Sequence, residues 1–342
     1  MNKKDRIYVA GHTGLVGSAI IRNLKEKGYE NVFTERTWSS YLEKQPKLFP
    51  EENSRVHDLR EKDLACYIIN NIRPDVVFNC AAKVGGILAN NNAQAEFLYD
   101  NLMISANIIH AAHKYGVKKL LNLGSVCMYP REAPTPIKEE SICNGLFEPT
   151  NEGYAVAKVT AAKMCQMYNK QYDTQYYTLV PCNLYGPNDN FDPQSSHVLP
   201  ALIRKFHRAK LSNADVVSLW GSGKAVREFL YVDDLADIAV RLMEVPMLKN
   251  YTWARGTRCI YNIGGSIKLS IHNLAQTIAE VIGYKGLMTY DNIKPDGAPL
   301  RELDDSRLFS IIERPAKMTQ IREGIRKTYQ WALENDVFSR ET

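Results

Sequence analysis

Short apolar runs alternate along the chain with stretches in which apolar residues recur at helical spacing. The first run, residues 7–10, is followed by a turn with glycines and then by residues 18–27, which end before Gly28. This pattern predicts a strand, a tight turn and a helix that a glycine ends. Four further apolar runs are interpreted as buried strands, at residues 32–34, 76–80, 120–123 and 177–180. Because helical stretches such as residues 104–115 separate these runs, the sequence predicts an α/β fold with a Rossmann-type doubly wound parallel sheet.

The second half of the chain has a different texture. Residues 185–196 are crowded with Gly, Pro, Asn, Asp and Ser, which favour irregular backbone. Ser270 is predicted to cap a helix that ends at Gly283, and its apolar face carries Leu274, Ile278 and Ile282. We therefore expect a smaller α/β cap to begin after residue 183.

Three segments complete the predicted organisation. Residues 229–240 and 261–264 are expected to return to the large sheet, and residues 41–54, rich in Lys, Glu, Pro and Asn, to form a surface insertion. The predicted domains are both discontinuous. The Rossmann domain comprises residues 1–183 and about 229–266, and the cap comprises about 184–228 and 267–342.

The composition mainly excludes classes of protein and kinds of site. The 342 residues include 43 basic and 38 acidic side chains, interspersed along the chain, and the net charge of +5 is too small to indicate nucleic-acid binding. The seven cysteines show no spacing typical of a disulfide framework or zinc site. No run reaches the roughly 20 apolar residues of a membrane span, and the charged first residues lack a signal-peptide core. We expect a cytoplasmic protein without metal, nucleic acid or membrane partners.

Three glycines at the first strand-to-helix turn provide the first chemical signal. Gly11, Gly14 and Gly17 are three residues apart. Glycine at this place lets the backbone approach a diphosphate, whose charge is met by the amides at the start of the helix. The position therefore favours a dinucleotide site over a purely structural turn.

The sequence does not decide which dinucleotide binds. An acid about 20 residues after the turn binds the adenosine ribose hydroxyls of NAD, whereas an arginine there accommodates the 2′-phosphate of NADP. Glu35 and Arg36 stand together at this place. Either of them is also explained as a solvated surface residue.

A tyrosine, a lysine and a serine define the reaction class. Tyr154 and Lys158 are four residues apart in a predicted helix, residues 153–168, and so share one face. An adjacent ammonium stabilises a phenolate, which makes Lys158 the tuner of the phenol and Tyr154 the acid. Ser125 directly follows a predicted strand, at the edge of the sheet where ligands bind. With a nicotinamide opposite, this set indicates interconversion of a ketone and an alcohol.

The glycine turn 11–17, Ser125 and the Tyr154/Lys158 pair resemble the extended short-chain dehydrogenase/reductases that act on nucleotide sugars. Within this family, the chain is similar in register over nearly its whole length to the enzymes that convert GDP-4-keto-6-deoxymannose to GDP-L-fucose. The segments that carry this likeness are 81–87 (AAKVGGI), 125–130 (SVCMYP), 183–187 (NLYGP), 220–223 (WGSG) and 227–229 (REF).

The resemblance implies NADPH as cofactor and two reactions, epimerisation at C3 and C5 followed by reduction at C4. It places a cysteine and a histidine as the acid and base of epimerisation, at Cys127 and His197. The implied cofactor contacts are Gly11, Thr13, Gly14, Leu15, Val16, Gly17, Arg36, Asp58, Leu59, Ala81, Ala82, Lys83, Tyr154, Lys158, Pro181, Asn183, Leu184 and His197. The implied substrate contacts are Asn183, Val198, Leu202, Lys205, Trp220, Arg227 and Arg301.

Some positions depart from the family pattern. Thr13 stands where some members have an arginine that reaches the 2′-phosphate, and Val126 where a polar residue is frequent. Lys205 and Arg301 exchange one cation for another. These changes keep a C4 reductase of a GDP-4-keto-6-deoxyheptose, from capsule or lipopolysaccharide sugar synthesis and without its own epimerisation, as an alternative. A non-catalytic NADP-sensing protein is a third hypothesis. The resemblance also implies a homodimer.

Overall fold

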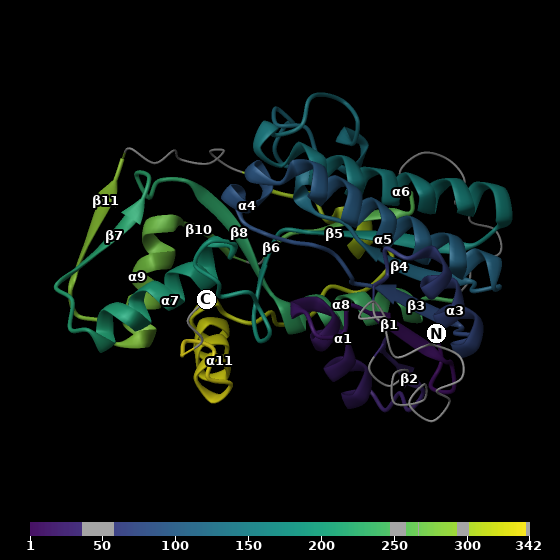
Figure 1. Ribbon diagram of the computed structural model, residues 1–342, viewed down its shortest axis with the longest axis horizontal. Helices are drawn as coiled ribbons and strands as arrows, with labels where there is room; N and C mark the ends of the chain where they lie inside the picture. The colour runs from purple at the N-terminus through teal and green to yellow at the C-terminus, as the bar shows by residue number, and fades with distance from the viewer. Residues whose placement is uncertain (36–57, 247–257, 266, 293–300, 340–342) are drawn as a thin grey trace.

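The computed structural model describes residues 1–35, 58–246, 258–265, 267–292 and 301–339. A six-stranded parallel sheet forms its larger part, in the order β2-β1-β3-β4-β5-β9 (Figure 1). The strands are β1 (Ile7–Ala10), β2 (Val32–Phe33), β3 (Val76–Asn79), β4 (Lys119–Leu123), β5 (Gln175–Pro181) and β9 (Ile260–Ile263). The five apolar runs between residues 7 and 180 interpreted as strands all lie in this sheet, so the predicted α/β fold is confirmed.

The strand order fixes where a ligand binds. Strand β2 lies on one side of β1 and β3 on the other, so the direction of the chain across the sheet reverses at β1. In open parallel sheets the crevice at the carboxyl ends of the strands beside such a reversal is the ligand site. The glycine turn follows β1 at this edge.

Helices cover both faces of the large sheet (Figure 1). Helices α1 (Leu15–Glu26) and α8 (Val232–Glu244) pack together on one face. The opposite face carries α3 (Lys62–Ile72), α5 (Gln94–Lys114) and α6 (Glu152–Tyr172). A short helix, α4 (Ile87–Asn92), precedes α5. Each face therefore has its own buried core.

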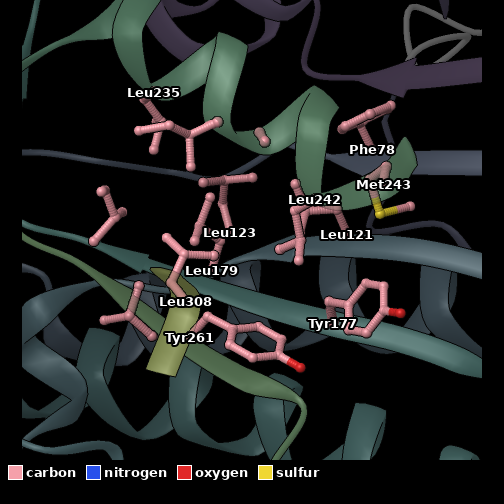
Figure 2. Close-up of a cluster of buried hydrophobic side chains, with 14 of the residues drawn as sticks. Phe78, Leu121, Leu123, Tyr177, Leu179, Leu235, Leu242, Met243, Tyr261 and Leu308 are labelled. Atoms are coloured by element: carbon pink, nitrogen blue, oxygen red, sulfur yellow. The ribbon is translucent and has the colours of Figure 1, made fainter. Parts of the chain in front are cut away.

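Figure 2 shows the core between α8 and the sheet. Leu235 and Leu242 of α8 point toward Leu121, Leu123 and Leu179 of the central strands. All five side chains are buried. This packing holds the central strands β4 and β5 rigidly, and with them the residues at their carboxyl ends.

A second group of elements lies at the other end of the molecule (Figure 1). It contains a three-stranded sheet of β10 (Ile267–Ser270), β8 (Val226–Tyr231) and β6 (Asn183–Tyr185), and a two-stranded sheet of β11 (Leu287–Asp291) and β7 (Val216–Trp220). Its helices are α7 (Val198–Leu211), α9 (Ile271–Ile282) and α11 (Ile321–Glu334), whereas the short helix α10 (Ser306–Phe309) packs against β9 of the large sheet. A third core joins α7, α9 and α11 to these strands. The domain boundaries given above stay a prediction.

The expectation for residues 229–240 is half wrong. Their strand, β8, pairs with β10 and β6 in the second group, and only the following helix α8 returns to the large sheet. Phe229 and Tyr231 belong to the core of the second group, whereas Leu230 belongs to the core under α8. An apolar strand with a core on each face does not reveal from its sequence which sheet it joins. Residues 261–264 do return, as β9 beside β5.

Other predictions differ in extent. The helix predicted at residues 104–115 is the second half of α5, whose first turns carry polar residues. Two of them, Asp100 and Asn101, are nevertheless buried. The helix α9 is confirmed, because Ser270 Oγ accepts from the Asn273 N–H at 3.1 Å and Gly283 ends it. Residues 41–54 lie outside the described residues. Within the described part of the chain, no helix is long and apolar enough to cross a membrane.

Candidate active site

The glycine turn after β1 is shaped by two of its three glycines. Gly11 has φ +75°, and a Cβ there would lie 2.7 Å from the backbone of Ala81. A Cβ on Gly17 would lie 2.2 Å from the carbonyl oxygen of Gly11. The Gly14 position is open, since its Cβ would be in ordinary contact at 3.6 Å. The fold therefore requires Gly11 and Gly17, and leaves the Gly14 side of the turn accessible to a ligand.

The start of α1 has the features of an anion site. The N-cap residue, Gly14, has no side chain to cap the helix, and the first turn, which begins with Leu15 and Val16, contains no acidic residue. Backbone amides at such a terminus bind phosphate groups. The turn thus fits the diphosphate of a dinucleotide, with Thr13 as the hydroxyl within it.

Glu35 lies two residues after the end of β2 and is held by the same turn. Its Oε1 accepts from the Gly11 N–H and the Tyr8 hydroxyl, each at 3.1 Å, and its Oε2 lies 2.6 Å from His12 Nδ1. The side chain is buried, so the interpretation of Glu35 as a solvated residue is wrong. Arg36 lies outside the described residues.

The other predicted cofactor residues lie along the same edge. Ala81, Ala82 and Lys83 follow β3, and Pro181 ends β5. Lys83 is fixed from both sides, because its N–H donates to Asn101 Oδ1 and its carbonyl accepts from Asn101 Nδ2, each at 3.0 Å. Its ammonium lies 2.5 Å from Glu96 and 3.0 Å from Asp100. The ammonium and both backbone polar groups of Lys83 are therefore paired within the chain.

Asp58 and Leu59 lie just before α3. The Asp58 carboxylate pairs with Arg60 at 2.6 Å, and the Leu59 carbonyl accepts from Asn107 Nδ2 at 3.2 Å. Leu59 is buried. These contacts hold Asp58 and Leu59 in place next to the large sheet.

Ser125 and Cys127 meet directly beyond β4. Ser125 caps the one-turn helix Val126–Met128, and its hydroxyl oxygen lies 2.7 Å from Cys127 Sγ. Cys127 is buried, and burial raises the pKa of its thiol, with the Ser125 hydroxyl acting in the opposite direction. The thiol is therefore neutral near pH 7 and able to give a proton.

Tyr154 and Lys158 face this pair from α6. Lys158 Nζ lies 5.6 Å from the centre of the Tyr154 ring and donates to the Leu123 carbonyl at 2.8 Å. Lys158 is only 3% exposed, and burial lowers its pKa to about 8. Ser125, Cys127, Tyr154 and Lys158 are thus brought together at the end of β4.

The electrostatics of the phenol differ from the sequence-based expectation. Burial, and then Cys127, raise the pKa of Tyr154 above its ordinary value, and only a hydrogen bond with Ser125 acts to lower it. The Lys158 ammonium is itself desolvated and donates to the Leu123 carbonyl, and the pKa of the phenol stays raised despite its neighbourhood. The phenol is therefore neutral and holds the proton that a ketone reduction needs.

His197 enters from the second group of elements. It stands at the N-cap of α7, directly before Val198, and its side chain is accessible. The protein around the imidazole lowers its pKa by desolvation, so the ring is neutral at pH 7. The preceding loop is held against the segment after β3, because the Gly86 N–H donates to the Ser195 carbonyl at 2.7 Å. A Cβ on Gly86 would lie 2.6 Å from the Ser196 carbonyl oxygen.

The predicted substrate residues are spread over the second group. Asn183, predicted to contact both ligands, and Leu184, predicted to contact the cofactor, lie in β6, and Asn183 Nδ2 donates to the Glu228 carbonyl at 3.0 Å. Leu202 and Lys205 lie in α7, and the Lys205 ammonium donates to the Ser218 carbonyl of β7. Strand β7 lies at the far end of the molecule from the large sheet (Figure 1).

The remaining predicted substrate residues are two cations and one aromatic residue. Trp220 ends β7 and is 56% exposed. Arg227 lies in β8. Arg301 approaches the catalytic cluster instead, since its guanidinium donates to the Val126 carbonyl at 3.2 Å and to the Pro130 carbonyl at 3.1 Å. It therefore braces the turn that carries Cys127.

Sequence reasoning missed the residues that support the site. Asn101 holds Lys83, and Gly86 holds the loop before His197. Asp189, in the loop after β6, was not singled out either: desolvation raises the pKa of its carboxyl to about 7, and its Oδ2 has no hydrogen-bond partner among the described residues. The family segments were visible in the sequence, but these supporting contacts depend on which loops meet. Within the described residues, no group of His, Cys, Asp and Glu could hold a metal ion.

Known proteins share this fold and much of this sequence. The NAD dependent epimerase/dehydratase family matches residues 7–264. A GDP-L-fucose synthase from Escherichia coli is 44% identical over 336 residues, which cover 97% of this chain and 98% of that protein. A solved GDP-mannoheptose C4 reductase from Campylobacter jejuni with NADP bound is 33% identical, with a TM-score of 0.79 over 97% of this chain and 99% of that one.

A second similar structure also has NADP bound. A GDP-L-fucose synthetase from Naegleria fowleri bound to NADP is 28% identical, with a TM-score of 0.82 over 100% of this chain and 96% of that one. The similarity thus extends over both groups of elements. The chain belongs to the NAD dependent epimerase/dehydratase family, as a full-length relative of the GDP-L-fucose synthases.

Proposed function

We propose that this chain converts GDP-4-keto-6-deoxymannose to GDP-L-fucose, by epimerisation at C3 and C5 and reduction at C4, with NADPH as reductant. One observation carries the proposal: the Ser125 hydroxyl lies 2.7 Å from the Cys127 thiol at the end of β4, opposite Tyr154 and Lys158. A serine and a tyrosine suit a ketone reduction, and a thiol beside them suits proton transfer to the carbons flanking that ketone. The full-length likeness to GDP-L-fucose synthases supports the same assignment.

In the reduction, Ser125 donates a hydrogen bond to the C4 carbonyl oxygen and Tyr154 delivers a proton to it. Bound NADPH supplies the hydride to C4. The raised pKa of Tyr154 keeps the proton on the phenol until the oxygen becomes an alkoxide. Lys158 then stabilises the phenolate, since its ammonium is close to the ring and cannot move far from the Leu123 carbonyl.

In the epimerisation, His197 and Cys127 act from opposite groups of elements. The C4 ketone acidifies the protons on C3 and C5, so a neutral imidazole can remove one of them. The neutral Cys127 thiol then protonates the other face of the carbon, which inverts the centre. The pKa directions of both side chains match these roles, because His197 is held neutral and Cys127 is held protonated.

We assign the GDP part of the substrate to the second group of elements. Arg227 offers a planar fork for the diphosphate, and Trp220 an exposed ring for the guanine. Val198, Leu202 and Lys205 lie in α7 and are assigned to contacts with the rest of the substrate. This arrangement suits a long substrate whose sugar reaches Ser125 while its base reaches the end of β7.

A coupled assay tests the proposal. The purified protein is mixed with NADPH and either GDP-4-keto-6-deoxymannose or a GDP-4-keto-6-deoxyheptose, and NADPH consumption and product are followed. We expect consumption with the hexose and formation of GDP-L-fucose. Turnover only with the heptose would reject the proposal.

A C4 reductase of a GDP-heptose is the second candidate. The observation that favours it is the likeness to the Campylobacter jejuni GDP-mannoheptose C4 reductase over 97% of the chain. The heptose arm of the same assay distinguishes the two. Absence of epimerisation with either sugar would favour this second function.

We also propose a homodimer formed through α5 and α6. These helices pack side by side on one face of the large sheet, and Tyr99, Met167 and Tyr172 are large side chains exposed on them. Sedimentation of the wild type should give a dimer, and Met167→Glu should shift it toward the monomer. A wild-type monomer at assay concentration would contradict this assembly.

A further inference from the structure

The loop that carries His197 is held by a side chain that the proposed function does not use. Between β6 and α7, Asp192 Oδ1 accepts from the Gln194 N–H at 2.9 Å, from the Ser195 N–H at 2.8 Å and from the Ser195 hydroxyl at 2.9 Å. The Asp192 carbonyl accepts from the Ser196 N–H at 3.0 Å. Asp192 therefore binds each of the three residues that directly precede His197.

Asn190 adds to the hydrogen bonds of this loop. Its Oδ1 accepts from the Asp192 N–H at 2.9 Å, and its Nδ2 donates to the Ser195 hydroxyl oxygen at 2.9 Å. The Ser195 hydroxyl thus accepts from Asn190 and donates to Asp192. Arg204 of α7 donates to the Phe191 carbonyl at 3.2 Å, and its guanidinium is attracted by the charge of Asp192. The loop is therefore bonded within itself and joined to the helix that it precedes.

The same loop contacts the large unit. The Ser195 carbonyl accepts from the Gly86 N–H at 2.7 Å, and a Cβ on Gly86 would lie 2.6 Å from the Ser196 carbonyl oxygen. Asp192 binds the backbone N–H groups of these same two serines, through its carboxylate and its carbonyl. It therefore sets how the peptide groups beside Gly86 are oriented, and His197 directly follows them.

We propose that Asp192 is a positioning residue for His197: through residues 194–196 it fixes the imidazole relative to Cys127, and so it supports epimerisation but not reduction. The inference rests on the proposed function, in which His197 and Cys127 carry out the epimerisation. An aspartate suits this role because hydrogen bonds to a carboxylate are roughly twice as strong as those between neutral groups. Reduction does not depend on this loop, because its proposed residues all lie in the large unit.

Two assays measure the two reactions independently, with NADP⁺ added in each. Epimerisation is followed with GDP-4-keto-6-deoxymannose in deuterated water, as deuterium that enters C3 and C5 in the absence of a reductant. The C4 step is followed in reverse, as the initial rate at which NADP⁺ oxidises GDP-L-fucose, because this reaction requires no inversion. A change in the loop should therefore affect the first assay and leave the second unchanged.

Four variants are compared with the wild type. Asp192→Ala removes the acceptor, whereas Asp192→Asn keeps an oxygen that can accept the same hydrogen bonds without the charge. Ser195→Ala removes only the hydroxyl and keeps the backbone contacts. The matched control is Asp75→Ala. Asp75 is an exposed loop aspartate whose carboxylate accepts the Arg6 N–H at 2.8 Å, and it precedes β3, at the edge of the sheet opposite the site.

We expect Asp192→Ala to lower kcat for deuterium incorporation by about thirtyfold and to leave KM for the GDP-sugar within about twofold, because a displaced base costs rate rather than substrate affinity. Asp192→Asn should restore epimerisation to within about fivefold of the wild type, and Ser195→Ala should lower it by about threefold. Oxidation of GDP-L-fucose should change by less than about twofold in every variant, and Asp75→Ala should change neither reaction.

Unchanged epimerisation in Asp192→Ala, or equal losses in both reactions, would overturn the inference, because the side chain would then be dispensable or only support the fold. If thermal unfolding shows that Asp192→Ala does not fold, Asp192→Asn and Ser195→Ala decide by the same criterion. A wild type that oxidises GDP-L-fucose but incorporates no deuterium would overturn the proposed epimerisation and this inference with it. A wild type that does neither would overturn the proposed function as a whole.

Discussion

The residues proposed for reduction and those proposed for epimerisation are held in different ways. Ser125, Tyr154 and Lys158 come from β4 and α6, which pack within the large unit, and Lys158 is tied to the Leu123 carbonyl of β4 itself. Of the epimerisation pair, Cys127 shares this frame but His197 stands before α7 in the second group. The residues proposed for reduction therefore all belong to the large unit. Epimerisation depends in addition on how the large unit and the second group of elements are placed relative to each other.

This difference explains how one fold can serve enzymes with and without epimerisation. A small shift of α7 leaves the distances among Ser125, Tyr154 and Lys158 unchanged. The same shift changes the distance between Cys127 and His197. The loop contact at Gly86 is the described feature that couples the two groups near His197.

The largest effect is expected at the phenol. Tyr154→Phe removes the proton donor but keeps the ring, so NADPH consumption should fall by about a thousandfold while dinucleotide binding is retained. The measurement is a stopped-flow or steady-state assay together with a fluorescence titration. Wild-type turnover in this variant would remove Tyr154 from the reaction.

The next effect separates the two reactions. Cys127→Ser should slow epimerisation by about a hundredfold, because a hydroxyl is a far weaker acid than a thiol. Reduction should persist, so that the product shifts to the sugar reduced without inversion, as read by NMR. An equal loss of both reactions would show that Cys127 supports the frame instead.

A glycine substitution tests the coupling between the groups. Gly86→Ala places a methyl group where a Cβ lies 2.6 Å from the Ser196 carbonyl oxygen, and so displaces the loop before His197. We expect epimerisation to fall by about tenfold and reduction by less than about threefold. The matched control is Gly116→Ala, which is remote from the site, has open space around its Cβ and carries only the strain of its φ of +80°. Equal losses in both reactions would contradict a role specific to His197.

The smallest effect is a pH dependence of reduction. Burial lowers the pKa of Lys158 to about 8, so its ammonium is present below that pH and is lost as the pH rises through it. The rate of reduction at saturating cofactor should therefore fall about fourfold between pH 7 and pH 8.5. This alkaline limb should be absent in the residual activity of Lys158→Met. A wild-type rate that is flat over this range would contradict the assignment.

Much of the cofactor side was predictable because it depends on local sequence. The strand, glycine turn and helix at the N-terminus follow from one short segment, and Ser125 follows from its place after an apolar run. The cap of α9 is equally local, since Ser270 and Gly283 are its own ends. Such features need no knowledge of distant contacts.

The rest depends on contacts between segments far apart in the chain. Glu35 looked like a surface residue beside Arg36, and only its contacts with Gly11 and His12 show that it is buried. The expected lowering of the Tyr154 pKa by Lys158 did not allow for desolvation of both groups. Strand β8 was assigned to the wrong sheet because its two faces serve two cores.

The most direct test of the central claim, that one site both epimerises and reduces, is the reaction in deuterated water. The wild type is incubated with NADPH and GDP-4-keto-6-deoxymannose, and the position of deuterium in the product is read by NMR and mass spectrometry. The account predicts GDP-L-fucose with deuterium at C3 and C5. A reduced product without deuterium at these carbons would show that Cys127 and His197 do not epimerise, and would contradict the account.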